Sequence, residues 1–402
     1  SNGKIIREWQ HFDPPYSGKY SGLAERDLIR ELQERLYKAV EQQMVSDVPI
    51  GAFLSGGLDS SSVVAMMQKV EPEAFTRCYT IGLPPEFGDS ENAQDLPHAV
   101  EVANHLNLDL KTLIVQPDII EQLGKMVYHL DEPQADPAPI NTLLIAEQAR
   151  KDGYKVLLSG AGGDDLFSGY RRHWALKVEQ LWGWLPQFAR RGLRWTSNEN
   201  PFIKLPRRLR KAMAYADLPT EDRLISYFFW TSTQLSQNLY SGDFAYLLGN
   251  EDPSQPLRES LRNIPEEKDP INQMLYLETK HFLADHNLNY TDKMGMAAGV
   301  EIRVPILDQD LVDFAATLPP SLKQKWHTSK YILRKAMKDY LPSNVISRPK
   351  TGFGAPIRRW INHELRDSVD DLLSVESLSN RGIFDPIKVR SIIKQTRHNG
   401  LD

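Results

Sequence analysis

The sequence has 402 residues, of which 41% are hydrophobic and 25% are charged, proportions typical of a globular protein. Its formal net charge of −5 and its pI near 6.1 argue against a protein whose whole surface is basic enough to bind nucleic acid. The single cysteine, Cys78, excludes an intrachain disulfide framework, and neither a membrane-spanning stretch nor a signal peptide is evident, so we expect a cytoplasmic protein.

The chain opens with an irregular segment. Residues 1–22 are expected to form an arm or linker, because prolines, glycines and aromatic residues are mixed there without a period. The opening Ser-Asn-Gly lacks a methionine and is expected to be a cloning remnant. Between residues 23 and 43, apolar residues recur at helical spacing and predict a helix that lies against a sheet.

Short apolar runs alternate with helical patterns over residues 23–172, which predicts an α/β core with a doubly wound parallel sheet. The expected strands are Val48 to Leu54, Arg77 to Leu83, Leu110 to Val115 and Lys155 to Ser159. The expected helices end near Leu106 and cover residues 118–129 and 140–152. Ligands of such sheets bind at the carboxyl ends of the strands, where the loops 55–60, 82–91 and 159–165 would meet.

After Tyr170 the strand signals fade. Helical patterns dominate, as in residues 220–230, 271–298, 307–317 and 328–340. We therefore predict a mostly helical region over residues 173–402 that completes the site. The basic stretch 190–211 is either a solvated helix face or a docking surface for an acidic partner.

The turn after the first expected strand reads Gly-Ala-Phe-Leu-Ser-Gly-Gly-Leu-Asp-Ser-Ser-Ser-Val-Val, and its serines are expected to cap the next helix through their hydroxyl groups. Backbone N–H groups and the helix dipole converge at such a turn and predict an anion site. Gly56 and Gly57 let the main chain approach a phosphate closely, while Ser55 and Ser60 add hydroxyl donors. Asp59 would sit beside that phosphate if Mg²⁺ bridges the two. The alternative is a plain turn with a solvated, capping aspartate.

A second glycine-rich turn follows the strand that ends at Ser159. It reads Ser-Gly-Ala-Gly-Gly-Asp-Asp-Leu-Phe-Ser-Gly-Tyr. Its four glycines and two acids, Asp164 and Asp165, again indicate backbone close to a nucleotide and carboxylates close to a metal. The alternative, a turn with a capping aspartate, is disfavoured because two such turns occur in one chain.

The run Ser-Gly-Gly-Leu-Asp-Ser in the first turn resembles the pyrophosphate loop of the N-type ATP pyrophosphatases, and residues 20–360 resemble the synthetase half of asparagine synthetase B-type enzymes. The resemblance implies an adenine nucleotide alpha hydrolase-like fold, cleavage of ATP between its α and β phosphates, an acyl-adenylate, and amide formation with ammonia. It also implies that Asp59 and Asp164 act in catalysis by holding Mg²⁺. The positions that it assigns to the nucleotide are Phe53, Ser55, Gly56, Gly57, Ser60, Ile81, Ser159 and Gly160.

Four further positions match the family. Lys350, followed by Thr-Gly-Phe-Gly, resembles the catalytic lysine of a loop that reaches back over the phosphates, where an ammonium would stabilise developing negative charge. Lys330 matches a position that assists it. Glu132 either lies at the rim of the acceptor site or is a solvated acid where a helix stops. Asp292 is expected to face the cleft, whereas the charged residues around it are expected to hold a turn.

One position departs from the family. Asparagine synthetases carry a glutamate two residues after the serine of the second turn, and that glutamate is implicated in forming and aminating the aspartyl-adenylate. This sequence has Ala161 there, and a methyl group cannot do acid–base or electrostatic work. Either another group supplies that function or the acceptor is not free aspartate. Besides an asparagine synthetase-like ligase, the sequence leaves open an amidotransferase or cyclase acting on a sugar acid or peptide, and a silent nucleotide-binding module.

Intact relatives carry an N-terminal glutaminase domain whose first residue is a nucleophilic cysteine. The sequence in hand contains no such domain, and Cys78 lies inside an expected strand, so we expect ammonia to be delivered from outside this chain. The resemblance leaves a homodimer open and predicts neither nucleic acid nor a membrane as a partner.

Overall fold

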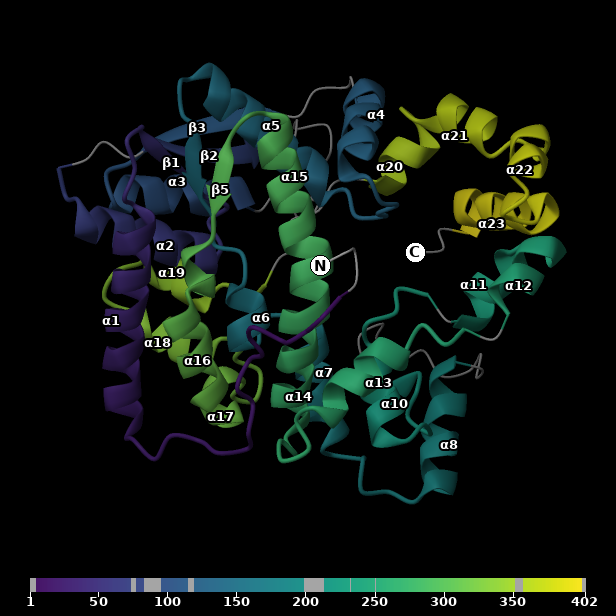
Figure 1. Ribbon diagram of the computed structural model, residues 1–402, viewed down its shortest axis with the longest axis horizontal. Coiled ribbons are helices and arrows are strands. Elements are labelled where there is room, and N and C mark those ends of the chain that lie inside the picture. Colours follow the sequence, from purple (N-terminus) through teal and green to yellow (C-terminus); the bar gives the residue numbers. More distant parts are fainter. Residues whose placement is uncertain are drawn as a thin grey trace.

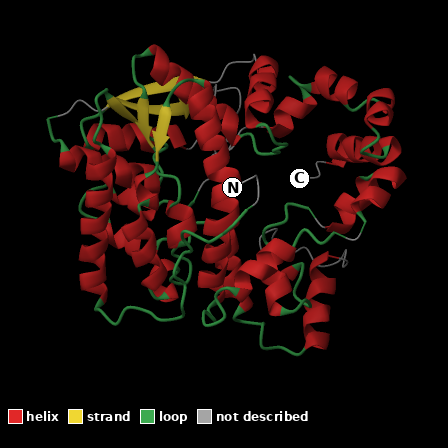
Figure 2. Cartoon of the chain, in the orientation of Figure 1, coloured by secondary structure: helices red, strands yellow, loops and turns green. Residues whose placement is uncertain are grey.

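The computed structural model describes residues 5–73, 77–82, 95–114, 119–198, 213–231, 233–249, 251–350 and 357–399. A five-stranded parallel sheet lies at one end of the molecule and is surrounded by helices (Figures 1 and 2). In their order across the sheet the strands are β3 Asp109–Ile114, β2 Arg77–Gly82, β1 Ile50–Phe53, β4 Val156–Leu158 and β5 Glu301–Arg303. The chain changes direction across the sheet between β1 and β4, which is where doubly wound sheets bind ligands. The predicted doubly wound parallel sheet is confirmed.

Helices make up most of the remaining structure. The helices of the first half are α1 Glu25–Gln43, α2 Leu58–Val70, α3 Asp95–His105, α4 Ile119–Leu130, α5 Ala138–Lys151, α6 Gly163–Phe167, α7 Arg171–Glu179 and α8 Gln187–Asn198. The helices of the second half are α10 Thr220–Ser226, α11 Thr233–Leu239, α12 Gly242–Leu248, α13 Gln255–Arg262, α14 Pro270–Leu277, the π-helix η3 Glu278–Leu288, α15 Asn289–Ala297, the 3₁₀ helix η4 Pro305–Leu307, α16 Gln309–Thr317, α17 Pro320–Lys323, α18 Tyr331–Ala336, α19 Ser343–Ser347, α20 Ile357–Asn362, α21 Arg366–Leu372, α22 Val375–Arg381 and α23 Pro386–Asn399. In the part of the chain that the structure describes, none of these helices combines the length and the apolar character needed to cross a membrane.

Alternate residues of the central strands fill two hydrophobic cores, one on each face of the sheet. Ala52 and Leu158 belong to the larger core, together with buried residues of α1 and α2. Tyr79 and Leu157 belong to the core on the other face, which includes residues of α5. Because helices cover both faces, the central strands β1 and β4 are apolar throughout, and this is why their positions could be predicted from the sequence.

The fifth strand comes from the region in which no strand was predicted. β5 lies beside β4, with Leu157 opposite Ile302 in the parallel ladder. It is three residues long, too short for a periodic pattern to reveal it. Packing also crosses the predicted division at residue 172, because Ile306 and Leu311 share the larger core with α1 and α2.

The helices α22 and α23 lie far from the sheet, where they meet α11 and α12 (Figure 1), whereas Trp360 of α20 packs with residues of α4 and α5. The contact includes an antiparallel bridge between Tyr240 and Phe384, whose rings stack with centroids 5.7 Å apart. This contact joins the C-terminal helices α22 and α23 to the segment that contains α11 and α12.

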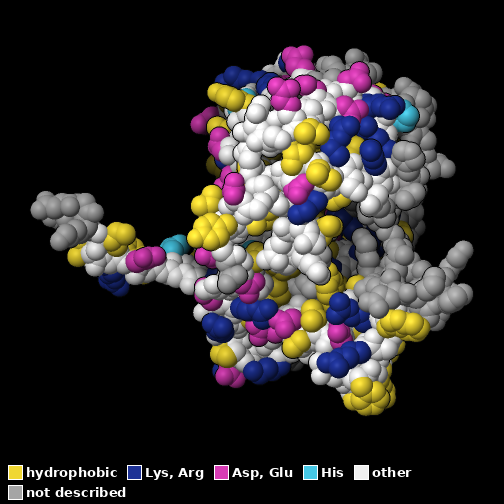
Figure 3. All heavy atoms as spheres, turned by 90° about the vertical axis from the view of Figure 1, so that its right-hand side faces the viewer, with side chains coloured by type: hydrophobic (Ala, Val, Ile, Leu, Met, Phe, Trp, Pro, Cys, Tyr) yellow, Lys and Arg dark blue, Asp and Glu magenta, His cyan; other side chains and the backbone are white. Residues whose placement is uncertain are grey.

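The described part of the basic stretch 190–211 lies on α8. Arg190 donates a hydrogen bond to the carbonyl oxygen of Ala216 at 3.2 Å, and Arg194 forms an ion pair with Asp217 at 3.1 Å. On the face shown in Figure 3, Lys and Arg side chains are interspersed with Asp and Glu side chains. Arg190 and Arg194 therefore attach α8 to the residues that precede α10, which is a structural role.

Candidate active site

The turn between β1 and α2 leaves the N-terminus of α2 open. Gly57 is the N-cap residue, and no side chain forms a capping hydrogen bond there. The serines bond elsewhere: Ser60 Oγ donates to the carbonyl oxygen of Gly57 at 3.2 Å, and Ser62 Oγ donates to that of Leu58 at 2.6 Å. The prediction of hydroxyl caps is therefore wrong. Uncapped N–H groups at the positive end of the helix dipole suit an anionic ligand.

Two glycines bring the two predicted loops together. Gly56 has a φ of 67°, in the left-handed region that glycine adopts without strain. Gly160 lies so close to α2 that a Cβ atom added to it would be 2.4 Å from the backbone nitrogen of Ser60. The loop after β4 is thus in contact with the first turn of α2, and both loops face the same space.

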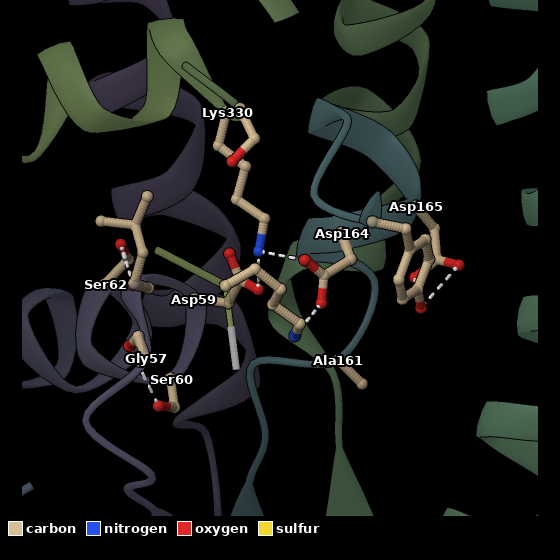
Figure 4. A network of polar contacts seen from close by, with 12 residues as sticks. Gly57, Asp59, Ser60, Ser62, Ala161, Asp164, Asp165 and Lys330 are labelled. Carbon is tan, nitrogen blue, oxygen red and sulfur yellow. Dashed lines mark hydrogen bonds and ion pairs between the residues drawn. The ribbon is translucent and has the colours of Figure 1, made fainter. Parts of the chain in front are cut away.

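Four charged side chains gather between these loops (Figure 4). Lys330, immediately before α18, forms ion pairs with both Asp59 and Asp164, and its Nζ lies 2.5 Å from Asp164 Oδ1. Lys350 Nζ lies 2.5 Å from Asp164 Oδ2. Lys330 has a φ of 53°, a backbone conformation that costs a residue other than glycine about 1–3 kcal/mol. Such strain persists only where the surrounding structure enforces it, and it is concentrated at functional sites.

Burial and ion pairing have opposite effects on the two carboxyl groups. Burial disfavours the charged form of Asp164, but Lys330 and Lys350 outweigh burial and hold the pKa of Asp164 below its usual range. Burial raises the pKa of Asp59, and although Lys330 opposes this effect, the neighbouring charge of Asp164 adds to it. Another cation beside the two aspartates would therefore favour the state in which both are ionised.

The two aspartates fit a magnesium ion whose coordination is completed by phosphate oxygens. Asp59 Oδ1 is buried and has no hydrogen-bond partner among the described residues, so it is an acceptor without a donor. Mg²⁺ in nucleotide sites is commonly held by one or two carboxylates together with phosphates. Within the described ranges no group of three His, Cys, Asp or Glu side chains is placed to hold a metal ion.

Both loops open into one cavity of about 1220 Å³. One end, which we call the loop end, contains the four charged side chains, Ala161 and six of the predicted nucleotide positions, namely Phe53, Ser55, Gly57, Ser60, Ser159 and Gly160. The other end, which we call the aromatic end, includes Tyr170, Trp174, Tyr227, Trp230, Phe282 and Tyr290. Pockets for one small ligand usually measure roughly 300–1,000 Å³, so this cavity has room for a second substrate beside a nucleotide.

Four predicted positions do not line this cavity. Gly56 is part of the first loop but does not face the cavity, and its carbonyl oxygen accepts a hydrogen bond from Arg348 at 3.2 Å. Ile81 packs into the hydrophobic cores that contain residues of α4 and α5. Glu132 and Asp292 are exposed to solvent. Binding roles for these four residues therefore remain predictions from the sequence.

The structure also adds residues that the sequence did not single out. Asp136, rather than Glu132, lines the cavity from the loop before α5, and its Oδ2 contacts His286 Nε2 at 3.0 Å. Arg348 lines the cavity close to Lys350 and forms a buried ion pair with Asp95. Both pairs join residues far apart in the chain, so no local pattern could reveal them. Residues 351–356, which follow Lys350, lie outside the described residues.

Comparison with known proteins gives a consistent result. A family model described as "Asparagine synthase" matches residues 31–401. The chain is 31% identical over 363 residues to asparagine synthetase [glutamine-hydrolyzing] 1 of Bacillus subtilis (strain 168), covering 87% of this chain and 53% of that protein. It is 30% identical over 344 residues to a putative asparagine synthetase [glutamine-hydrolyzing] of Mycobacterium tuberculosis (strain ATCC 25618 / H37Rv), covering 82% and 48%.

A more distant relative is the amidase chyE of Penicillium rubens, which is 27% identical over 420 residues, covering 93% of this chain and 60% of that protein. The chain spans about half the length of the curated relatives that it matches. Because the family model matches nearly the whole sequence, the chain belongs to the asparagine synthase family.

Proposed function

We propose that this protein is an ATP-dependent, AMP-forming amide ligase. A carboxylate attacks the α-phosphate of ATP, pyrophosphate leaves, and ammonia or another amine then displaces AMP from the acyl-adenylate. The observation that carries the proposal is the cluster of Asp59, Asp164, Lys330 and Lys350, which joins two glycine-rich loops at one cavity. Membership of the asparagine synthase family supports the same class of reaction.

The first loop would bind the phosphates of ATP. The open N-terminus of α2 supplies backbone N–H donors and the positive end of the helix dipole. The hydroxyl groups of Ser55 and Ser60, which lie 3.0 Å apart, add further donors. The close approach of Gly160 to Ser60 keeps the second loop against these donors, so a nucleotide would contact both loops at once.

The charged cluster would serve the departure of pyrophosphate and the attack on the α-phosphate. Asp59 and Asp164 are the residues that would hold Mg²⁺, which neutralises phosphate charge when it is bound. Lys330 keeps the two carboxylates together through its ion pairs with both. Lys350 places a positive charge where the transition state becomes more negative than the ground state, and such an interaction lowers the barrier.

The assignment of Lys350 can be tested by ATP–pyrophosphate exchange, which reports adenylation without the amide-forming step. We expect Lys350→Met to reduce exchange by about 10²-fold or more, the usual effect of removing one electrostatic stabiliser. Lys338→Met, which changes an exposed lysine outside the cavity, is the matched control and should exchange normally. Normal exchange in Lys350→Met would remove this lysine from the mechanism. Binding of ATP without exchange for any carboxylate would instead indicate a nucleotide-binding module.

A further inference from the structure

The aromatic end of the cavity is a wall of rings that hold one another in place. Phe282, His286 and Tyr290 follow one another by four positions along η3 and α15, so they lie on one helix face. The ring centroids of Phe282 and His286 are 4.9 Å apart in a stacked pair, and those of His286 and Tyr290 are 5.6 Å apart, edge to face. Tyr170 meets Phe282 at 5.8 Å, and Trp230 meets His286 at 6.0 Å.

Charged side chains of this wall form ion pairs inside the protein, while Arg172 Nη2 is buried without a hydrogen-bond partner among the described residues. The guanidinium of Arg172 lies over three aromatic rings and forms an ion pair with the fully buried Glu278. His286 pairs with Asp136. Asp165 also lines the cavity and accepts a hydrogen bond from the hydroxyl group of Tyr170 at 3.3 Å. A small zwitterion such as free aspartate needs ionic partners for its second carboxylate and its ammonium, and this wall presents mostly ring faces.

A small side chain lines the loop end of the cavity. Ala161 lies next to the charged cluster and lines the cavity (Figure 4). A methyl group at this position occupies little volume beside Asp164. At the other end, Trp230 is 63% exposed, so its ring is available to a ligand. The charged cluster, Ala161 and the ring of Trp230 therefore line one cavity, whose volume of about 1220 Å³ accommodates an acceptor larger than aspartate.

We infer that the acceptor is a carboxylic acid whose carboxylate is carried on a ring-bearing body larger than free aspartate. The ring stacks on the aromatic wall, where Trp230 and Phe282 are exposed to the cavity, while the carboxylate reaches past Ala161 to Lys350. A carboxylate oxygen bonds to the α-phosphorus as the bond from that phosphorus to pyrophosphate breaks. The amine nitrogen then bonds to the carbonyl carbon and loses a proton as AMP leaves. This inference rests on the proposed ligase function.

The first test is ATP–pyrophosphate exchange with three acids: free aspartate, the methyl glycoside of glucuronic acid, and N-acetyl-aspartyl-tyrosine amide. We expect at least one ring-bearing acid to half-saturate exchange at a concentration about tenfold lower than aspartate does, a difference typical of one good aromatic contact. The acid that responds tells a sugar acid from a peptide acid. Exchange that is best with aspartate overturns the acceptor class and leaves the ligase function standing. No exchange with any of the three overturns both.

The second test separates stacking from folding. Trp230→Ala should raise the KM of the responsive ring acid by about tenfold, whereas Trp230→Phe, which keeps an aromatic face, should restore most of the loss. Trp184→Ala is the matched control, because Trp184 is exposed and lies outside the cavity. The KM for ATP serves as the internal reference for an intact loop end. A KM for the ring acid that is unchanged in Trp230→Ala, or that changes equally in Trp184→Ala, contradicts the inference.

Discussion

The two ends of the cavity are built in different ways. At the loop end, the main chain sets the geometry: glycines bring two strand-to-helix loops into contact, and the open N-terminus of α2 and paired charges face the ligand. At the aromatic end, the side chains set the geometry: rings from three distant segments of the chain, represented by Tyr170, Trp230 and Phe282, pack on one another. The loop end tolerates little change, because a single Cβ atom added to Gly160 would collide with the backbone of Ser60.

This difference suggests how one fold can keep a reaction while changing its substrate. Phosphate chemistry depends on N–H groups and charges whose positions are set by short contiguous motifs. Acceptor recognition depends on individual side chains, which can be exchanged without disturbing the sheet or its loops. We therefore expect substitutions at the loop end to lower turnover for every acceptor, and substitutions at the aromatic end to change the choice of acceptor.

The largest effect should come from Asp164→Asn. This change removes a buried carboxylate that pairs with two lysines, so it leaves Lys330 and Lys350 without their shared partner. We expect exchange to fall by about 10³-fold, at the upper end for loss of one electrostatic stabiliser, and the free energy of unfolding to fall by about 3 kcal/mol. Both quantities can be measured on the same preparation, by pyrophosphate exchange and by urea unfolding.

The matched control is Asp131→Asn, which removes an exposed carboxylate that pairs with Lys293 at 2.6 Å. An exposed pair contributes about 0–1 kcal/mol, so both activity and stability should stay close to those of the unaltered protein. Asp164→Asn with normal turnover would show that the charged cluster is structural only, and the comparison between the two ends would fail.

A smaller effect is expected from Gly160→Ala. The added Cβ atom would lie 2.4 Å from Ser60 N, so the two loops must separate. Overpacking of this kind costs about 1–3 kcal/mol of stability, and a displacement near 1 Å costs about 10²-fold in rate. Gly124→Ala, in α4, meets nothing within 4 Å and should be neutral or slightly stabilising. Equal behaviour of the two variants would refute the contact between the loops.

The last prediction concerns stability rather than turnover, and it involves a lysine that lacks a carboxylate partner of the kind found at the loop end. Lys323 is fully buried and donates to the amide oxygen of Asn272 at 2.8 Å. Burial lowers its pKa from 10.5 to about 7, so the unfolded chain binds more protons than the folded protein does between these two values. The free energy of unfolding should therefore rise with pH across that window, and the gain should be absent below it.

Chemical unfolding at several pH values checks this prediction. Lys323→Met should flatten the rise, because the variant has no ammonium to bury. A stability that falls as pH increases from 7 to 10 in the unaltered protein, or a rise that persists in Lys323→Met, would contradict the account.

The sequence could predict the loop end because its signals are local. The strands β1 and β4 are apolar runs, and the glycines and acids follow them directly in the chain. β5 escaped prediction because it has three residues and pairs with β4 across a long separation in sequence. The aromatic end and the pairs of Asp136 with His286 and Arg348 with Asp95 escaped for a related reason, because they exist only when distant segments pack together.

The central claim is that the acceptor carboxylate attacks the α-phosphorus of ATP, and isotope transfer tests it most directly. The acid that best supports exchange is labelled with ¹⁸O in its carboxylate and incubated with the protein, ATP, Mg²⁺ and ammonia, and the nucleotide product is analysed by mass spectrometry. The account predicts AMP that carries one ¹⁸O atom. The amine attacks the carbonyl carbon, so the bridging carboxylate oxygen leaves with the α-phosphorus as part of AMP. Label in inorganic phosphate together with ADP as the product would contradict it.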